Sequence, residues 1–453
     1  MKMKILTDRK SSVDLLHGSI LKSMIAFAIP LFFSNVFQQL YNTVDTVIIG
    51  YTLGDEALAA MGAAGAVYDL LIGFCFGIGN GLTIVTARSF GSGDEGRLKK
   101  SVACAVSLGA GIMAVITILS RFILYPFLRV LHTPPEIMDQ SYAYVSTITL
   151  FIGVMFAYNV CAGLLRAIGN SVMPLVFLVL SSILNIILDL FFITGLGMGV
   201  KGAAVATVIA QGVSVMCCLI YIGWKVKILI PQREHFTWDK KLYMEMLAQG
   251  LSMGFMNCVV SAGTAILQAG INSLGYLVIA GHTAARKLVQ FLNMPFIAVS
   301  HTMSTFVSQN YGAGQAGRIR KAMKYSYLYG AALAGVVTVL MLFFAPALVR
   351  LLSGSSEKVV IENGALYLQV VAPALAILAM INPTRFGLQA IGQKMLPLYS
   401  SLIELVGKIL FVAFLIPKFQ YMAVIFCEPV IWCFMVTELL FAFWRNPFIK
   451  EGK

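Results

Sequence analysis

The stretch MIAFAIPLFFSNVFQQLYNTVDTVIIG, residues 24–50, is long enough to cross a lipid bilayer, for which about 20 apolar residues suffice. It nevertheless contains a proline, Pro30, and a carboxylate, Asp45. Polar residues that lie on one helical face follow at steps of four, four and three: Ser34, Gln38, Asn42 and Asp45. Such a stripe is costly in a membrane unless it faces protein or water. We therefore interpret it as half of an ion-binding site, and Pro30 as a kink within one span.

The composition indicates a multi-pass membrane protein. Of the 453 residues, 59% are hydrophobic and only 12% are charged, whereas a soluble protein would be about a quarter charged. Apolar segments recur along the whole chain, which favours helices over a porin-like barrel of alternating strands. The net charge of +13 does not indicate nucleic-acid binding, because the basic residues lie in short loops between spans. Residues 1–20 are polar and of mixed charge, so we expect no cleavable signal peptide.

Twelve spans are predicted, all helical, joined by short loops. The longest polar connection is 225–241, in the middle of the chain. The predicted spans are roughly 22–49, 57–88, 101–124, 140–164, 174–195, 203–224, 243–269, 277–308, 323–346, 361–386, 396–416 and 421–444.

Lysines and arginines predict the orientation of these spans. The side that holds both termini and the 225–241 loop carries 24 of the 33 basic residues, the opposite side carries six, and three lie within spans. Because short cytoplasmic loops are enriched in Lys and Arg, both termini are expected in the cytoplasm.

An internal repeat divides the chain. FGSGDEGRLKK at 90–100 recurs as YGAGQAGRIRK at 311–321, and RAIGNSVMPL at 166–175 recurs as QAIGQKMLPL at 389–398. Each half then has six spans, so the halves insert in the same orientation, as in parallel-repeat transporters. We expect an amino-terminal lobe at 1–224, a cytoplasmic linker at 225–242 and a carboxyl-terminal lobe at 243–453. Two such bundles can rock about a central site, which indicates a transporter.

A second polar stripe lies in the span 174–195. Ser182, Asn185 and Asp189 step by three and four along one face, and the next span adds Thr207. We expect the amino-terminal lobe to gather these side chains with those of the first span: Asp45, Asp189, Asn185, Thr207, Gln38 and Asn42.

Carboxylate, amide and hydroxyl oxygens suit a hard monovalent cation, and a buried carboxylate pair suits a proton. The alternative is that each acid pairs with a lysine or arginine, but none lies deep in the first six spans. Asp69 in the second span is a third candidate, either lining the cleft or purely structural.

The second half has polar faces of a different kind. Glu404 and Lys408, four residues apart, are explained by a salt bridge within one helix. Arg286 either lines the cleft or extends to the outer interface. We therefore expect this half to form a substrate wall, with cleft-lining Asn257, Gln268, Arg286 and Gln290.

Signatures of enzymes are not evident. The five histidines show no metal-ligand spacing, no Walker motif is present, and the eight cysteines lie in apolar segments as packing residues. Gly77, Gly79 and Gly81 predict close helix packing rather than a phosphate loop. We expect no catalytic residue, no cofactor, and no metal beyond a possible sodium ion at Asp45 and Asp189.

Several segments resemble the multidrug and toxic compound extrusion (MATE) family, and the resemblance covers essentially the whole chain. They are FAIPLFFSNVFQQLYNTVDTVIIGYTLG, FGSGDEGRLKKS, LLRAIGNSVMP, LNIILDLFFITGLGMGVKGAAVATVIAQ and SQNYGAGQAGRIRKA.

The resemblance implies a twelve-helix, two-lobed antiporter that exports cationic, amphipathic drugs or metabolites in exchange for protons or sodium ions. It implies a cation site at Asp45, Asn185, Asp189 and Thr207, with Asn159 as a further member. In another branch of the family, acids of the seventh and tenth helices take part. This chain has Ser252 where a proline often stands in the seventh span, and only Glu362 at the start of the tenth.

The leading hypothesis is a monomeric cation-coupled exporter in a prokaryotic plasma membrane, with small-molecule substrates and no nucleic-acid partner. Pro30 would let the first span rearrange when the ion binds. The first alternative is a lipid-linked oligosaccharide flippase of the same superfamily, whose cleft would need arginines for a pyrophosphate; only Arg286 and Lys287 qualify. The second, a sensor or receptor, has no need of the duplicated architecture.

Overall fold

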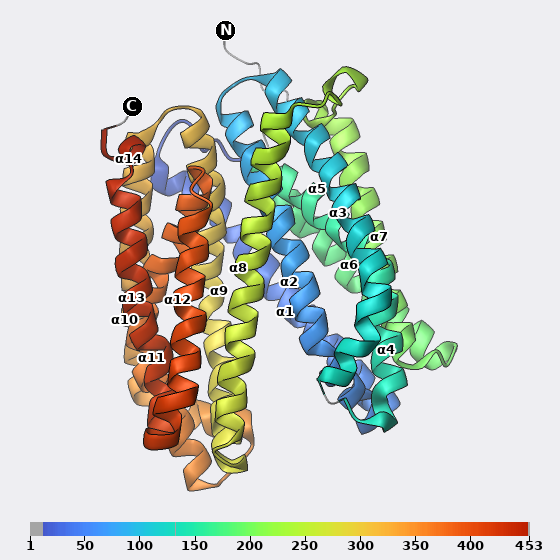
Figure 1. Cartoon of the computed structure of the whole chain (residues 1–453), viewed down its shortest axis with the longest axis vertical. Coiled ribbons are helices and arrows are strands. Elements are labelled where there is room, and N and C mark those ends of the chain that lie inside the picture. The colour runs from blue at the N-terminus through green and yellow to red at the C-terminus, as the bar shows by residue number, and fades with distance from the viewer. Residues whose placement is uncertain (1–11, 132, 452–453) are drawn as a thin grey trace. The chain divides into compact units, whose positions relative to one another are not determined.

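The computed structural model describes residues 12–131 and 133–451, and these residues contain helices and no strand (Figure 1). Lys2, Lys4, Arg9 and Lys10, which are among the 24 basic residues on the side of the termini, and His132, one of the five histidines, lie outside the described residues. The long helices are α1 (Ile20–Leu53), α2 (Asp55–Gly91), α3 (Glu95–Val130), α4 (Pro135–Leu150), α5 (Ile152–Ala167), α6 (Val172–Leu190), α7 (Gly199–Lys225), α8 (Lys240–Asn272), α9 (Tyr276–Gly312), α10 (Ala316–Ser353), α11 (Lys358–Ala390), α12 (Met395–Leu410) and α13 (Ile416–Arg445). A short α14 (Pro447–Glu451) follows, and π-helical turns extend α6 (Phe191–Gly195) and α12 (Phe411–Leu415).

The described helices confirm an all-helical membrane protein. Nine of the described helical segments are long and apolar enough to cross a membrane, or ten if the bent pair α4 and α5 is one span. One of the nine, Met395–Arg445, has 51 residues. At about 1.5 Å per residue it is more than twice as long as a bilayer core of about 30 Å, so it has room for two crossings. The prediction of twelve spans stays a prediction.

The predicted span 140–164 is the one that the structure breaks. Phe151 leaves the helical conformation at φ −109° and ψ 20°, and α4 and α5 bend by 49° across it. The sequence around it, ITLFIGV, is apolar apart from Thr149, so hydrophobicity alone carries no signal of the break.

The chain divides into two compact units. The amino-terminal unit comprises residues 26–254 and the segment up to Leu16; the carboxyl-terminal unit comprises residues 17–25 and 255–453. Two of the three boundaries, 25/26 and 254/255, fall inside helices α1 and α8, and the third, 16/17, precedes α1.

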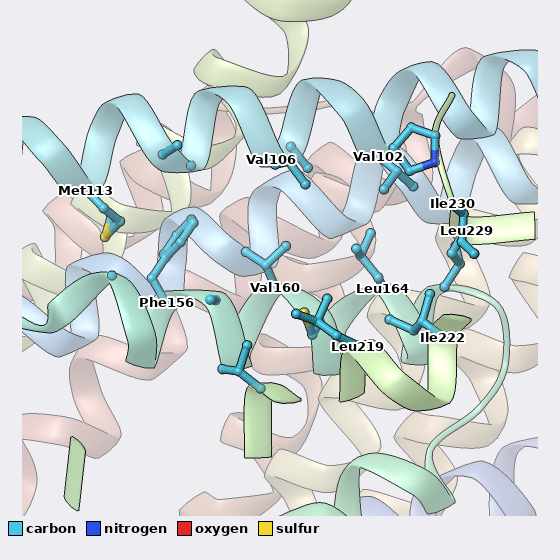
Figure 2. A pocket seen from close by; sticks show the side chains of 18 of the residues that line it. Val102, Val106, Met113, Phe156, Val160, Leu164, Leu219, Ile222, Leu229 and Ile230 are labelled. Carbon is cyan, nitrogen blue, oxygen red and sulfur yellow. The ribbon is translucent and has the colours of Figure 1, made fainter. Parts of the chain in front are cut away.

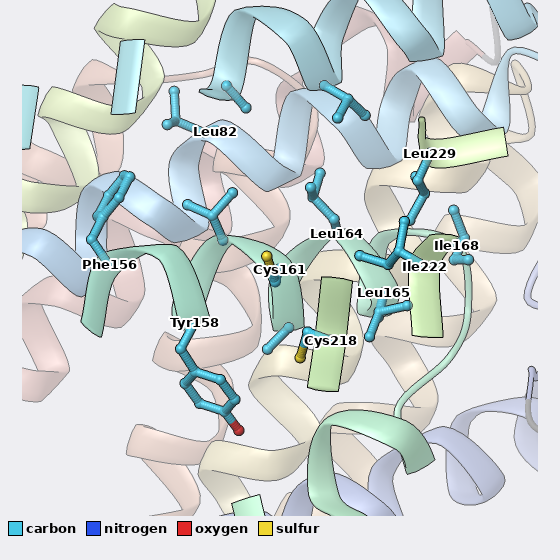
Figure 3. Packing of buried hydrophobic residues seen from close by; sticks show 14 of the residues in the cluster. Leu82, Phe156, Tyr158, Cys161, Leu164, Leu165, Ile168, Cys218, Ile222 and Leu229 are labelled. Carbon is cyan, nitrogen blue, oxygen red and sulfur yellow. The ribbon is translucent and has the colours of Figure 1, made fainter. Parts of the chain in front are cut away.

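The core of the amino-terminal unit lies where α2, α3, α5 and α7 meet (Figure 3). Leu82, Phe156 and Leu164 are fully buried there, and Cys161 and Cys218 are packed among them as free thiols. Glycines bring helices together at its edge. A Cβ on Gly77 would lie 2.5 Å from the backbone oxygen of Met253, so only glycine allows α2 to approach α8 this closely.

The carboxyl-terminal unit is organised around α11, which packs against α9, α10 and α13. Residues 17–25 belong to this unit, since Arg318 of α10 donates to the backbone oxygen of Gly18 over 2.9 Å.

Candidate cation site in the amino-terminal unit

The polar stripe of α1 reaches the interior of the amino-terminal unit at its second half. Tyr41 and Asp45, one turn apart, are both buried, and Asp45 is only 7% exposed. Gln38 and Asn42 are bonded to each other on the more exposed side, with the amide of Gln38 3.4 Å from Asn42 Oδ1. Of the four residues of the stripe, Asp45 is therefore the one that is buried in the interior.

The stripe of α6 supplies the second acid and an amide. Asn185 is fully buried and Asp189 is 1% exposed. When the amide nitrogen of Asn185 faces the acids, it donates to Asp45 Oδ1 (2.7 Å) and Asp189 Oδ2 (3.0 Å), while its oxygen accepts from the backbone N–H of Thr207 (3.2 Å). In the reverse orientation the nitrogen lies 3.5 Å from Thr207 Oγ1 and the amide oxygen faces carboxylate oxygens. The first orientation satisfies more partners.

The two carboxyl groups also contact each other as hydrogen-bond partners. Among residues 12–131 and 133–451, neither has a Lys, Arg or His within ion-pair distance, and Asp189 Oδ1 has no hydrogen-bond partner. Two ionised carboxylates in contact would repel strongly at this depth. A shared proton or a bound cation would relieve this repulsion. The alternative, in which each acid pairs with a lysine or arginine, is not seen among the described residues.

Helix α7 closes the group with Thr207, which accepts a hydrogen bond from the hydroxyl of Tyr41 over 3.2 Å. The sequence prediction omitted Tyr41. Its signal was present, because it lies four residues before Asp45 on the same face of the helix.

A cavity of about 170 Å³ opens beside this group. Asp45 lines it together with Asp69 of α2, so the third predicted acid of the first half does face the same space. The remaining lining residues are Tyr41, Asn42, Thr46, Met61, Gly65, Tyr68, Tyr144 and Thr207. A pocket for a drug-sized ligand is typically about 300–1,000 Å³, so this cavity suits an ion and its waters.

Asn159, which the family resemblance adds to the site, makes other contacts. Its amide donates to the backbone oxygen of Met155, one turn earlier in α5 (2.9 Å), and its Cβ lies near Gly79 of α2. Its role in the cation site stays a prediction.

Arg286, which the sequence places either in the cleft or at the outer interface, forms an ion pair within its own unit, and its cleft-lining role stays a prediction. Its guanidinium lies 3.0 Å from both carboxylate oxygens of Glu428 of α13, 142 residues away. Gln268 is bonded to Asn272 within α8 (2.8 Å), Gln290 is exposed, and Asn257 is partly buried. The predicted salt bridge of Glu404 and Lys408 is confirmed at 2.9 Å.

Pro30 lies within α1, which continues as one helix on both sides of it. Proline has no N–H, so the backbone oxygen of Ala26 loses its usual partner. The boundary between the two compact units falls directly before Ala26. The hydroxyl of Ser34 donates to the backbone oxygen of Pro30 (2.9 Å). The missing bond and the unit boundary therefore both fall at Ala26, and the hinge at Pro30 stays a prediction.

A larger pocket of about 540 Å³ lies elsewhere in the same unit, between α3, α5 and α7 (Figure 2). Its labelled side chains, among them Val106, Phe156 and Leu219, are apolar, and it contains none of the predicted site residues. No group of three or more His, Cys, Asp or Glu able to hold a metal ion occurs in the described part of the chain.

Comparisons with known proteins agree with this architecture. The MatE family model matches residues 30–191 and again 253–414, which together make up more than half of the chain. The probable multidrug resistance protein YoeA of Bacillus subtilis is 25% identical over 366 residues, covering 79% of this chain and 78% of that protein. An FAD transporter of Shewanella oneidensis is 24% identical, with 81% of each chain covered.

A solved structure has the same fold. It is described as the outward-facing conformation of a multidrug resistance MATE family transporter of the MOP superfamily, and it matches with a TM-score of 0.88 at 22% identity, covering 97% of this chain and 98% of that one. With a family model that matches both halves, the chain belongs to the MatE family, a family of multi-pass membrane transporters and not of enzymes.

Proposed function

We propose that this protein is a cation-coupled antiporter that exports amphipathic, mostly cationic organic molecules across a prokaryotic plasma membrane by alternating access. The observation that carries the proposal is the contact between Asp45 and Asp189, bridged by Asn185 and without a basic partner among the described residues. A buried acid pair without a basic partner is stabilised when it binds an external cation, whereas an acid that is already neutralised gains little from one.

The orientation of Asn185 bears on which cation is exchanged. With its nitrogen toward the acids, the amide donates two bonds and offers no oxygen to a metal ion, so this arrangement suits a proton shared by the carboxyl groups. A sodium ion would need the reverse orientation, in which the amide oxygen joins the carboxylate oxygens as a ligand.

The sign of the charge supports cationic substrates. Asp45 and Asp69 line the same cavity and Asp189 lies behind it, so the local field attracts cations and repels anions. The Bacillus relative is named for multidrug resistance and the Shewanella relative for FAD, an anion at neutral pH. The field of the acidic cavity disfavours an anion such as FAD as the substrate of this chain.

The ion would act through α1, since Asp45 and Pro30 belong to the same helix and fifteen residues separate them. A concentration ratio of ten supplies about 1.4 kcal/mol and a potential of 100 mV about 2.3 kcal/mol per charge. The bias of 24 basic residues against six supports cytoplasmic termini. We do not propose the flippase, because the arginine on which it depends, Arg286, is neutralised by Glu428.

The test is dye efflux from liposomes that contain the purified protein, with a cationic dye and, separately, FAD as cargo. A proton gradient, a sodium gradient or neither is imposed. We expect the cationic dye to be exported under one gradient, and Asp45→Asn and Asp189→Asn each to reduce export to the rate of empty liposomes. Export by both variants at the wild-type rate would overturn the coupling assignment, and export of FAD alone would overturn the substrate class.

A further inference from the structure

The two units contain helices that correspond residue by residue. Helices α2 and α9 both have 37 residues and both begin after a glycine with positive φ, Gly54 at 82° and Gly275 at 94°. The segment of α4 and α5, 135–167, equals α11, 358–390, in length at 33 residues. The repeated motif at 166–175 and 389–398 continues without a gap into α6 and α12. Two residues with positive φ also correspond: Gly199 begins α7, and Gln420 interrupts the helical conformation near the start of α13.

The correspondence holds in contacts as well as in sequence. In the amino-terminal unit, Ser141 of α4 donates to the backbone oxygen of Ala60 of α2 over 2.9 Å. The corresponding residues of the other unit are Gly364 of α11 and Gly281 of α9. A Cβ on Gly364 would lie 2.8 Å from the backbone oxygen of Gly281, so these two helices approach each other at the same place.

By this correspondence, several residues that line the acidic cavity have counterparts that lie together in the carboxyl-terminal unit. Members of this group of counterparts are charged where the residues of the amino-terminal unit are neutral. The pairs from the cavity lining are Met61 with His282, Gly65 with Arg286, Tyr144 with Tyr367 and Thr207 with Glu428. Asn185, which bridges the two acids beside the cavity, corresponds to Lys408.

The charged side chains bind one another. Glu428 accepts from Arg286 with both oxygens at 3.0 Å and from the hydroxyl of Tyr367 at 3.3 Å. The ammonium of Lys408 lies 2.9 Å from Glu404 and 3.8 Å from Glu428. Lys408 is only 2% exposed, so its charge is compensated by these acids rather than by water.

The backbone makes room for each cation. A Cβ on Gly263 of α8 would lie 3.2 Å from Lys408 Cδ, so a larger residue there would press on the lysine stem. In the amino-terminal unit a Cβ on Gly65 would meet no atom within 4 Å. The position that carries the guanidinium in one unit is therefore open space beside Asp45 and Asp69 in the other.

We propose that the carboxyl-terminal unit contains a latent cation site centred on Glu428, in which Arg286 and Lys408 are built-in cations that replace an exchangeable one. It follows that only the amino-terminal unit exchanges a cation, and that removing a built-in cation makes the carboxyl-terminal unit bind one from solution. The description of the amino-terminal group as a cation site rests on the proposed function; the charge balance around Glu428 does not.

Titratable and charged groups surround Glu428 on every helix packed against it. Helix α9 presents Arg286 and His282, and His282 is held by the hydroxyl of Tyr421 at 3.2 Å. Helix α11 presents Tyr367, and α12 presents Lys408 with Glu404 behind it. Arg385 of α11 lies 3.8 Å from Glu404, so that acid keeps a partner when Lys408 or Arg286 is changed.

The experiment measures the Tm of the full-length protein in detergent, in a background that silences the amino-terminal site, Asp45→Asn/Asp189→Asn. Arg286→Gly and Lys408→Asn are added separately, and each introduces the residue found at the corresponding position of the amino-terminal unit, Gly65 or Asn185. Tm is recorded at pH 6 and pH 8, and at pH 8 with sodium chloride or choline chloride at equal ionic strength. We expect no cation dependence in the background protein, and in Arg286→Gly a Tm about 3 °C higher with acid or sodium.

The matched control is Arg286→Gly/Glu428→Thr, which reproduces the neutral pair Gly65 and Thr207. It should fold and show no cation dependence. If Arg286→Gly does not fold but this control does, the cause is a Glu428 left with Lys408 alone, at 3.8 Å, as proposed. If Arg286→Gly folds without cation dependence, or if the control also fails to fold, the proposal is wrong. Failure of the proposed function would show separately, as equal cation dependence of wild type and Asp45→Asn/Asp189→Asn.

Discussion

The two units of this transporter both bury acids, but only the carboxyl-terminal unit supplies them with basic partners from its own described residues. In the amino-terminal unit Asp45 and Asp189 meet around an amide, and no described basic residue reaches them. In the carboxyl-terminal unit Glu428 and Glu404 meet around Arg286 and Lys408. Helices α2, α6 and α7 correspond to α9, α12 and α13, so at the positions they carry the difference lies in a few side chains and not in the fold.

The difference indicates in which unit the binding of an ion can change the conformational free energy most. A buried acid that already has a cation on its own chain gains little from an ion in solution, whereas an unpaired acid pair changes its energy greatly when an ion arrives. A ligand can shift a conformational equilibrium only by its differential affinity for the two states. The unpaired site therefore has the larger capacity to drive a conformational change, and the compensated one is suited to hold its helices together.

The largest effect is expected from Lys408→Met. Breaking a buried ion pair by removing one partner typically costs about 3–5 kcal/mol of unfolding free energy, because the other charge stays buried. Lys408 is bonded to Glu404 and lies near Glu428, so the loss should show as a clear fall in Tm.

The control for this variant is Lys408→Met/Glu404→Gln, which removes the nearest acid as well and should recover at least half of the lost stability. A fall in Tm that the second substitution leaves unchanged would mean that the lysine acts by packing, for example against Gly263, and not by its charge.

A second substitution carries the built-in cation into the other unit. In Gly65→Arg the side chain grows from open space into the cavity of Asp45 and Asp69. A tethered guanidinium acts at a high effective concentration, so we expect it to exclude the coupling ion and to reduce gradient-driven export by roughly 100-fold. The measurement is the initial rate of dye efflux from liposomes.

Gly65→Met is the matched control, since it adds a side chain of comparable length without charge. Export by Gly65→Met should fall less than export by Gly65→Arg. Equal losses in the two variants would mean that volume and not charge closes the cavity, and the comparison between the units would lose its electrostatic basis.

The sequence alone predicted most of the long helices and one of the two acid groups. Apolar length located α1 and its neighbours to within a few residues, because a membrane span needs a long apolar run. Periodicity found Asp45 and Asp189, because each ends a polar stripe on one helical face. The bend at Phe151 was missed, because an apolar sequence is compatible with either a straight or a broken span.

Glu428 was missed for a different reason. It stands in the run IFCEPVIW, with no polar neighbour at helical spacing that would mark a face. Its partner Arg286 is 142 residues away, so only the packing of α9 against α13 through α11 reveals why the acid is tolerated. Ion pairs between distant helices are invisible to a periodicity that operates within one helix.

A smaller effect is expected from Asn185→Leu, which keeps the volume of the side chain and removes its donor. Hydrogen bonds to charged groups contribute about 1.5–3 kcal/mol, and Asn185 makes two of them. We expect the cation concentration for half-maximal export to rise by roughly 10- to 100-fold. The control on the same helix is Ser182→Ala, whose hydroxyl bonds only to the backbone oxygen of Leu178 within α6. If half-maximal export is unchanged in Asn185→Leu, the amide does not bridge the acids during transport.

The smallest effect is expected from Tyr41→Phe, which removes one hydroxyl. Its bond to Thr207 is between neutral groups and is worth about 1 kcal/mol, or roughly a fivefold change in the cation concentration for half-maximal export. Tyr51→Phe is the control, because Tyr51 belongs to the same helix and is 91% exposed.

This last substitution is informative through its partner. If Tyr41 acts by holding Thr207, then Tyr41→Phe should have little effect once Thr207→Val has removed the acceptor, and the two changes should not add. Additive changes would mean that the hydroxyl of Tyr41 acts through Asp45, with which it also interacts, and that the hydroxyl of Thr207 acts on the ion independently. Thr207 would then be a ligand of the ion and not only a support for Tyr41. Glu428 holds the corresponding position in the carboxyl-terminal unit, so in that unit an acid would stand in the place of an ion ligand.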